Sequence, residues 1–405
     1  MFFRKIMKQN MTQEPIVYQT GTDVKLINKA EYCKSIIADG KELIIGNESG
    51  VITVPELKDP KVYITFKEGI TNFSDVFLGC IKLKSVPANL FANHPNATSF
   101  SGAFFGCMSL KSIPAGLFAN NRKVTDFYST FFGCTSLAAI PENLFAKCSE
   151  VTTFSTTFHA CDALTSIPEN LFANCPEVTD FDDTFSSCRT LTSIPEKLFA
   201  NNPEVISFNA TFVICSTLES IPEKLFANNP KVTDFESTFR FTALTSIPEN
   251  LFANCPAVTN FGGTFSKCKA LIAVPKGLFV HNPKVTDFEQ TFEGCSALTA
   301  IPENLFANNL AVTSFNFTFY GCKALTSIPA NLFDNNRKVT DFAYTFYGCK
   351  ALTGESPYTM IDGQKVHLYE RANYPEQFTA PENSDRCFYG CTGLTDYSQI
   401  PTDWL

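Results

Sequence analysis

The sequence predicts an α/β solenoid, a parallel stack of about ten 27-residue units with a cap at each end. Two observations predict this fold class. A cysteine followed three residues later by a leucine returns every 27 residues, and eight columns of the aligned repeat stay apolar in nearly every copy. Because each unit buries its apolar residues only against its neighbours, such a chain grows by adding units instead of separate cores. The cysteine–leucine pairs are Cys107/Leu110, Cys134/Leu137, Cys161/Leu164, Cys188/Leu191, Cys215/Leu218, Cys268/Leu271, Cys295/Leu298, Cys322/Leu325 and Cys349/Leu352.

The repeat divides the chain into three parts. Residues 1–55 lack the repeat and contain short apolar runs between turns, so they are expected to form a small β cap or an attachment segment. Residues 56–352 are the predicted solenoid, and residues 353–405 break the period, as a C-terminal cap that shields the last open core would. The ten full units begin at Leu83, Leu110, Leu137, Leu164, Leu191, Leu218, Leu244, Leu271, Leu298 and Leu325.

One step of the repeat is irregular. From Leu218 to Leu244 the spacing falls to 26 residues and the cysteine is missing. We expect Phe241 or Thr242 to occupy the place of the cysteine, with a distorted helical turn at this point.

Within one repeat, residues 164–190, the elements follow in order. Leu164–Ile167 is expected to be a short strand that ends at Pro168, because proline cannot continue a β-ladder. Proline also suits the first position of a helical turn, and this turn places a Leu-Phe pair on the core. A second extended segment, 178–181, leads into a second helical turn, 181–188, whose Phe and Cys share one face.

A polar column before the second turn supports this assignment. All its members belong to the residue types that cap helix N-termini, so capping is expected instead of an acidic ligand row. They are Ser99, Asp126, Thr153, Asp180, Ser207, Asp234, Asn260, Asp287, Ser314 and Asp341. A second column alternates Asn with Cys, which indicates a small side chain that hydrogen-bonds backbone at a buried turn. Its members are Asn121, Cys148, Cys175, Asn202, Asn229, Cys255, Asn282, Asn309 and Asn336.

The 16 cysteines raise the question of disulfides or metal ligands. Side chains stacked in register point in parallel, which is poor geometry for bridging, so buried free thiols are expected. Cys387 and Cys391 are the best disulfide candidate. The sequence has no Cys-x-x-Cys pair, only four His, no glycine-rich phosphate loop and no recognisable catalytic set. We therefore assign no catalytic residue, no metal ligand and no cofactor.

Composition limits the partners. A net charge of −8 argues against nucleic acid, which needs a basic surface, and favours a neutral or basic partner. No window reaches the roughly 18–20 apolar residues of a membrane span. The first ten residues lack the apolar core of a secretory signal peptide. The sequence contains 41 Phe residues and one Trp. The Phe residues are concentrated in the repeat columns and are expected to form the core.

The motifs Leu-Thr-Ser-Ile-Pro and Val-Thr-x-Phe-x-x-Thr-Phe-x-x-Cys-x-x-Leu resemble the BspA-like leucine-rich repeats of bacterial surface proteins. The resemblance covers roughly residues 70–352 and returns at 387–394. It implies a leucine-rich-repeat-like solenoid and a non-catalytic recognition or adhesion role at the cell surface or outside the cell, with a protein or cell-surface ligand as partner. The chain departs from surface members in lacking a visible signal peptide, so a cytoplasmic location stays open. The alternative function is a phage tail or fibre component used in host attachment, located in the virion.

Binding residues are expected in the columns that vary from unit to unit. Near the C-terminal end these columns become aromatic. Phe317 and Tyr344 share one column, and Tyr320 and Tyr347 share another, so these four residues are the candidate binding patch. The competing interpretation is that they pack under residues 353–386. Phe105, Tyr128 and Phe132 form a sparser set near the other end.

Overall fold

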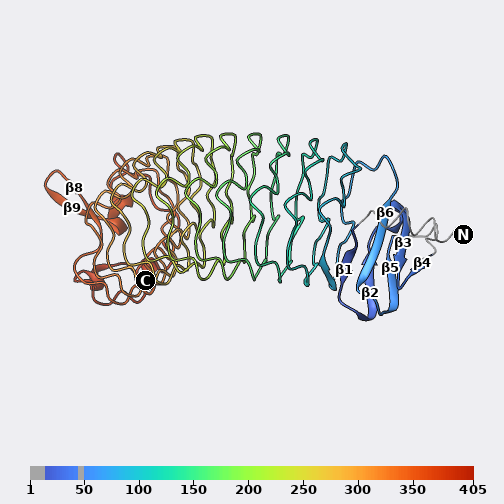
Figure 1. Cartoon of the computed structure of the whole chain (residues 1–405). Helices are drawn as coiled ribbons and strands as arrows, with labels where there is room; N and C mark the ends of the chain where they lie inside the picture. The colour runs from blue at the N-terminus through green and yellow to red at the C-terminus, as the bar shows by residue number, and fades with distance from the viewer. Residues whose placement is uncertain (1–13, 44–49) are drawn as a thin grey trace, which may run out of the picture. The chain divides into compact units, whose positions relative to one another are not determined.

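The computed structural model describes residues 14–43 and 50–405, and its compact units are residues 1–191 and 192–405. The first unit begins with an antiparallel β cap (Figure 1). Its larger sheet has the order β4-β3-β6-β1-β7, and β2 pairs with β5 in a second sheet. The elements are β1 (Ile16–Tyr18), β2 (Gly21–Ile27), η1 (Ala30–Tyr32), β3 (Cys33–Ala38), β4 (Lys41–Glu42), β5 (Ile52–Leu57), β6 (Lys61–Phe66) and β7 (Leu83–Ser85).

The β cap joins directly onto the repeats. Strand β7 is the first extended segment of the first full repeat, and Leu83 pairs with Tyr18 of β1. The strands of the cap continue past residue 55, to Phe66. Residues 1–55 contain two apolar runs that are expected to be short strands, 43–45 and 51–54. The second falls largely in β5, whereas Leu43 lies in no strand and 44–45 lie outside the described residues.

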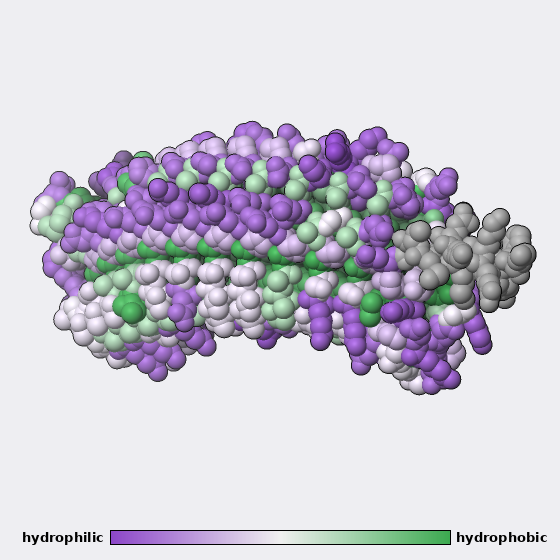
Figure 2. All heavy atoms as spheres, in the orientation of Figure 1, coloured by the Kyte–Doolittle hydropathy of each residue, from purple (hydrophilic) through white to green (hydrophobic). Residues whose placement is uncertain are grey.

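In both units each repeat folds into one coil of a parallel stack. Neighbouring coils form parallel β-bridges at the capping column, for example Ser99 with Asp126 in the first unit and Ser314 with Asp341 in the second. The expected strand at Leu-x-x-Ile is only partly realised, because its bridges are isolated, as between Ala273 and Ala300. The apolar columns are buried, as the sequence predicts. In the space-filling view hydrophobic residues reach the surface as a narrow green line, with a row of hydrophilic residues on one side and residues of intermediate hydropathy on the other (Figure 2).

The helical turns predicted from the sequence are not helices. The described residues contain only short 3-10 helices, and the segment after the capping column is a series of turns. Alternate backbone N–H groups there donate to the next coil: Phe317 to Ala343 (3.0 Å), Phe319 to Thr345 (2.9 Å) and Gly321 to Tyr347 (2.8 Å). An isolated helical turn forms few hydrogen bonds relative to the conformational entropy that its residues lose. The backbone N–H groups of this segment therefore pair with the neighbouring coil and not within a helix.

The capping column accepts the backbone hydrogen bonds that its residue types predict, although the segment that follows it is a series of turns and not a helix. Each of the ten side-chain oxygens accepts a hydrogen bond from the backbone N–H two residues later, at 2.6–3.2 Å. Asp126, for example, accepts from Tyr128 at 2.7 Å. Asp and Ser serve equally because only one acceptor oxygen is required.

The Asn/Cys column also behaves as predicted. Asn309 donates from Nδ2 to the backbone oxygens of Phe279 (3.2 Å) and Asn282 (2.8 Å) in the preceding coil. At the C-terminal end a different side chain takes over this role. The guanidinium of Arg371 donates to the backbone oxygens of Phe333 (2.7 Å) and Asn336 (3.3 Å).

The cysteine column is buried, and all 16 cysteines are free thiols, including Cys387 and Cys391. Sequence analysis missed that the column thiols are hydrogen-bond donors. Cys322, for example, donates to the backbone oxygen of Phe292 at 3.3 Å, and Cys349 donates to that of Phe319 at 3.1 Å. Burial raises the pKa of these thiols, to about 12 for Cys391.

At the irregular step Thr242 takes the place of the cysteine. Its hydroxyl is buried and lies 3.2 Å from the Cys268 sulfur, whereas Phe241 is 41% exposed. The preceding turns stay in register, since Phe239 and Phe241 still donate to the next coil. The missing residue therefore shortens only the link from Thr242 to Leu244. The turn segment before it keeps its hydrogen bonds to the next coil, so the expected distortion of that turn was wrong.

The C-terminal part of the second unit closes the stack. The hairpin of β8 (Tyr358–Ile361) and β9 (Gln364–His367) is followed by η2 (Leu368–Asn373), η3 (Tyr397–Gln399) and η4 (Thr402–Trp404). Residues 383–390 form a last coil, which accepts hydrogen bonds from Phe342, Tyr344, Phe346 and Gly348. No helix among the described residues is long and apolar enough to cross a membrane.

Candidate recognition surface

The four predicted aromatic residues lie together on the second unit. They occupy two outward-facing positions of the turn segment in adjacent coils. Phe317 stacks on Tyr344 with ring centres 4.5 Å apart, and Tyr320 stacks on Tyr347 at 4.8 Å. Within each coil the two rings also touch, at 5.3 Å for Phe317 and Tyr320. The four residues therefore form one continuous aromatic surface, and all four are partly exposed.

The last coil extends this surface by one residue that the sequence pattern did not single out. Tyr389 stacks on Tyr347 with ring centres 4.9 Å apart and is 49% exposed. It was missed because the chain inserts the β8–β9 hairpin before this coil, so the 27-residue period no longer aligns it. We call Phe317, Tyr320, Tyr344, Tyr347 and Tyr389 the aromatic ladder.

The C-terminal cap touches the ladder at its edge. The hydroxyl of Tyr344 donates to Asp385 (2.6 Å), and this hydrogen bond raises the pKa of Tyr344. The hydroxyls of Tyr320, Tyr347 and Tyr389 have no hydrogen-bond partner among the described residues. Because the rings remain partly exposed, three phenol groups are available to a ligand.

A glycine row and a lysine row run beside the ladder. Gly321, Gly348 and Gly390 each follow a ladder tyrosine and have φ of 68°, 71° and 80°. Other coils place side chains at this same position, including Ile214 and Lys267. Lys323 and Lys350 follow two residues after the glycines, are exposed, and form no ion pair with a described residue.

A polar hollow of about 110 Å³ lies further along the same face. Glu236, Arg240, Asp287, Glu289 and the small residues Gly262 and Gly263 line it. Burial raises the pKa of Asp287, and burial together with the charges of Asp287 and Asp341 raises the pKa of Glu289.

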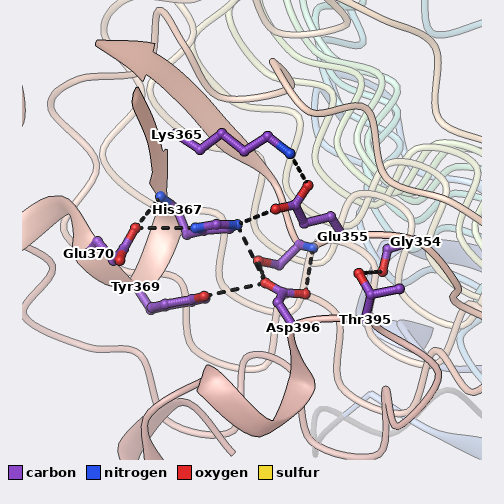
Figure 3. Close-up of polar contacts among 9 residues, drawn as sticks. Gly354, Glu355, Lys365, His367, Tyr369, Glu370, Thr395 and Asp396 are labelled. Carbon is purple, nitrogen blue, oxygen red and sulfur yellow. Dashed lines mark hydrogen bonds and ion pairs between the residues drawn. The ribbon is translucent and has the colours of Figure 1, made fainter. Parts of the chain in front are cut away.

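A polar network surrounds His367 in the C-terminal cap (Figure 3). Its Nε2 lies 3.0 Å from Glu355 and its Nδ1 lies 3.2 Å from Glu370. The buried Ser356 hydroxyl hydrogen-bonds Asp396, and Asp396 lies 3.7 Å from His367 Nε2. In a catalytic triad the histidine must bond the nucleophile and the carboxylate must orient the histidine. Here the serine bonds the carboxylate, so the network fastens the β8–β9 hairpin to the last coils.

Metal binding is not supported by the described residues, which hold no group of three or more His, Cys, Asp or Glu arranged to bind an ion.

In the first unit, Phe105, Phe132 and His159 form a second stacked row with ring centres 4.4 Å apart. Tyr128 lies in a different column and is 49% exposed.

Comparison with known sequences identifies the repeats. The sequence matches the BspA type leucine rich repeat region, in six copies, over residues 111–261 and 192–394. These matches together span residues 111–394, more than half of the 405 residues. The chain belongs to the BspA-type leucine-rich repeat family. The family confirms the leucine-rich-repeat fold that the 27-residue period predicts. No curated protein is significantly similar to this family member.

Several solved structures are similar to this BspA-type chain, at a level that concerns only the fold. A chain of the Drosophila Toll–Spatzle complex is 20% identical with a TM-score of 0.37, over 67% of this chain and 37% of that one. A leucine-rich repeat protein from Bacteroides ovatus is 19% identical with a TM-score of 0.30, over 76% and 85% of the two chains. A leucine rich cell surface protein from Faecalibacterium prausnitzii is 20% identical with a TM-score of 0.29, over 72% and 88%.

Proposed function

We propose that this BspA-type chain is a non-catalytic recognition module that attaches to a protein or another cell-surface ligand. The observation that carries the proposal is the aromatic ladder, in which five partly exposed rings stack in register. Interface energy concentrates in aromatic anchors, and Tyr is enriched among them. The backbone hydrogen bonds between neighbouring coils of the second unit hold these rings in position.

The location that fits this function is the cell surface or the extracellular space, as expected for a BspA-type repeat protein. Surface proteolysis of intact cells, with fractionation as a second measure, tests it: the native protein should be cleaved without lysis. Recovery only in the soluble cell interior would contradict a surface location. No observation favours the alternative of a phage tail component.

Replacing Tyr320 and Tyr347 with Ser tests the binding surface. The double variant should lose attachment to the cognate cell, because two adjacent anchors are removed, while its thermal melt stays close to that of the wild type. Tyr128→Ser is the matched control, since Tyr128 is an exposed tyrosine outside the ladder, in the first unit. A large fall in stability of the double variant would mean that the ladder is core under the C-terminal cap. Unchanged attachment would mean that the ligand binds elsewhere.

A further inference from the structure

We propose that the polar hollow on the second unit receives a lysine side chain of a protein partner, beside the aromatic ladder. The hollow measures about 110 Å³, and residues of three successive coils line it, among them Glu236, Gly262, Gly263, Asp287 and Glu289. This inference rests on the recognition role proposed above, because it names the class of partner and one side chain that the partner contributes.

Two adjacent glycines open the hollow. In the column of Gly262 every other coil carries a side chain, as Glu236 and Glu289 do on either side of it. At the next position, Gly263 has one glycine counterpart, in the first unit. The backbone does not require glycine there, because Gln290 adopts the same left-handed conformation, with φ of 56° against 61° for Gly263. The glycine pair therefore removes two side chains from one coil and leaves a space between its neighbours.

Three carboxylates line the hollow, and each keeps one oxygen free. One oxygen of Asp287 accepts from the backbone N–H of Glu289 (2.6 Å), and one oxygen each of Glu236 (3.2 Å) and Glu289 (2.8 Å) accepts from a side chain of the following coil. The other three oxygens have no hydrogen-bond partner among the described residues. The free Oδ2 of Asp287 lies 3.7 Å from the place where a side chain would begin at Gly262. A ligand with N–H donors would satisfy these oxygens.

The charges around the hollow favour a cation. Arg240 also lines the hollow, but its guanidinium lies 3.8 Å from Glu293, a carboxylate outside the lining. Lys267 pairs with the same Glu293 at 2.7 Å, so it does not neutralise the hollow either. Burial raises the pKa of Asp287 and of Glu289, as expected for carboxylates without a cation beside them.

A lysine suits these acceptors better than an arginine or a metal ion. The planar fork of an arginine bonds both oxygens of one carboxylate, whereas here each carboxylate offers a single oxygen. Glu236 and Glu289 stand on opposite walls, and the described residues hold no group of three or more His, Cys, Asp or Glu arranged to bind an ion. A lysine ammonium carries three rotatable donors on a flexible stem, so it can bond oxygens on different walls.

The hollow borders the aromatic ladder. Gln290 in its wall occupies the column of Phe317, one coil earlier, and its backbone N–H donates to the oxygen of Asn316 at 3.0 Å. A partner segment whose lysine enters the hollow would therefore lay its neighbouring residues over Phe317 and the rings beyond it. The charge in the hollow fixes the orientation of the partner, and the rings supply most of the binding energy.

The test is binding of the full chain to pentalysine, with pentaarginine, ε-acetylated pentalysine and spermidine for comparison. We expect the wild type to bind pentalysine most tightly, with an affinity that falls as salt rises. Asp287→Asn/Glu289→Gln should bind pentalysine roughly tenfold more weakly, because two charge-assisted contacts are lost. Glu223→Gln/Glu303→Gln is the control, since it removes the same charge from exposed residues that do not line the hollow, and it should bind as the wild type does.

A second variant fills the hollow without changing its charge. Gly263→Gln is compatible with the backbone, as Gln290 shows, and the nearest atom to its added Cβ is the rotatable hydroxyl of Ser237 at 3.1 Å. It should weaken pentalysine binding, whereas Gly363→Gln should not. Gly363 has φ of 80° in the β8–β9 turn, with no atom within 4 Å of an added Cβ. Thermal melts of all variants show whether each still folds.

Four results would overturn the proposal: no binding of the wild type to pentalysine, equal binding to pentaarginine or the acetylated peptide, equal binding to spermidine, or equal loss in the two carboxylate double variants. If one of these occurs while Tyr320→Ser/Tyr347→Ser still abolishes cell attachment, the recognition role stands and only the lysine is wrong. Attachment that survives the tyrosine variant but is lost in Asp287→Asn/Glu289→Gln would instead contradict the ladder and leave the hollow as the binding site.

Discussion

Arg371 offers a direct test of how the solenoid ends. Its side chain is 3% exposed, donates to the backbone oxygens of Phe333 and Asn336, and lies over the ring of Phe378 at 4.2 Å. We expect Arg371→Met to leave both buried carbonyl groups without these donors. Hydrogen bonds from a charged donor contribute roughly 1.5–3 kcal/mol each. Burial lowers the pKa of Arg371 to about 10, so part of that gain already offsets the cost of desolvating the cation. The net destabilisation should be about 2–4 kcal/mol.

The single tryptophan makes the loss measurable at the right place. Trp404 is 4% exposed and packs against Phe342 and Phe388, with ring centres 6.2 Å away in both cases. Its fluorescence therefore reports unfolding of the C-terminal cap, and a loss of that size lowers the urea midpoint by roughly 1 M. Arg337→Met is the control, because Arg337 is exposed and directly follows Asn336, and it should shift the midpoint little. An unchanged midpoint in Arg371→Met would refute the reasoning, since it would mean that an apolar side chain closes the stack equally well.

Two further outcomes follow from buried groups. The folded-state pKa of Asp287 is raised, so the native state holds this proton more tightly than the unfolded chain, and stability should fall as pH rises through that pKa. Asp287→Asn keeps the capping oxygen, as Asn260 does in the neighbouring coil. The variant should be more stable than the wild type at neutral pH, and its stability should change less with pH in mildly acidic buffer. If urea melts show a less stable variant, the charge of Asp287 is needed. Thiol titration should find 16 reactive cysteines in denaturant without reductant and very few in the native protein, and a lower total would indicate disulfides.

The period and the capping column were enough to predict the stacking of coils and the burial of the apolar columns. Two features, the conformation of the turn segment and the hydrogen bonds of the cysteine column, were not predicted from the sequence. Phe185 and Cys188 were expected on one face of a helical turn, because a spacing of three residues fits a helix. The same spacing arises in turns whose alternate N–H groups pair with the next coil. The periodicity of one sequence cannot distinguish a helical turn from such a series of turns. The hydrogen bonds of the cysteine column could not be predicted from the pattern of one repeat, because each thiol donates to a backbone oxygen in the neighbouring coil.

The conformation of this turn segment also accounts for the position of the proposed binding surface. Phe317 and Tyr344 have φ of 54° and 56°, which is unusual for aromatic residues. Both are held there by backbone hydrogen bonds to the following coil, from Phe317 to Ala343 and from Tyr344 to Asp385. Because backbone pairing fixes the conformation, the side chain at this position is free to vary from Asp183 to Gln290 to Phe317 without changing the coil. Recognition residues can therefore change at positions that contribute little to the core, while neighbouring coils keep them in register.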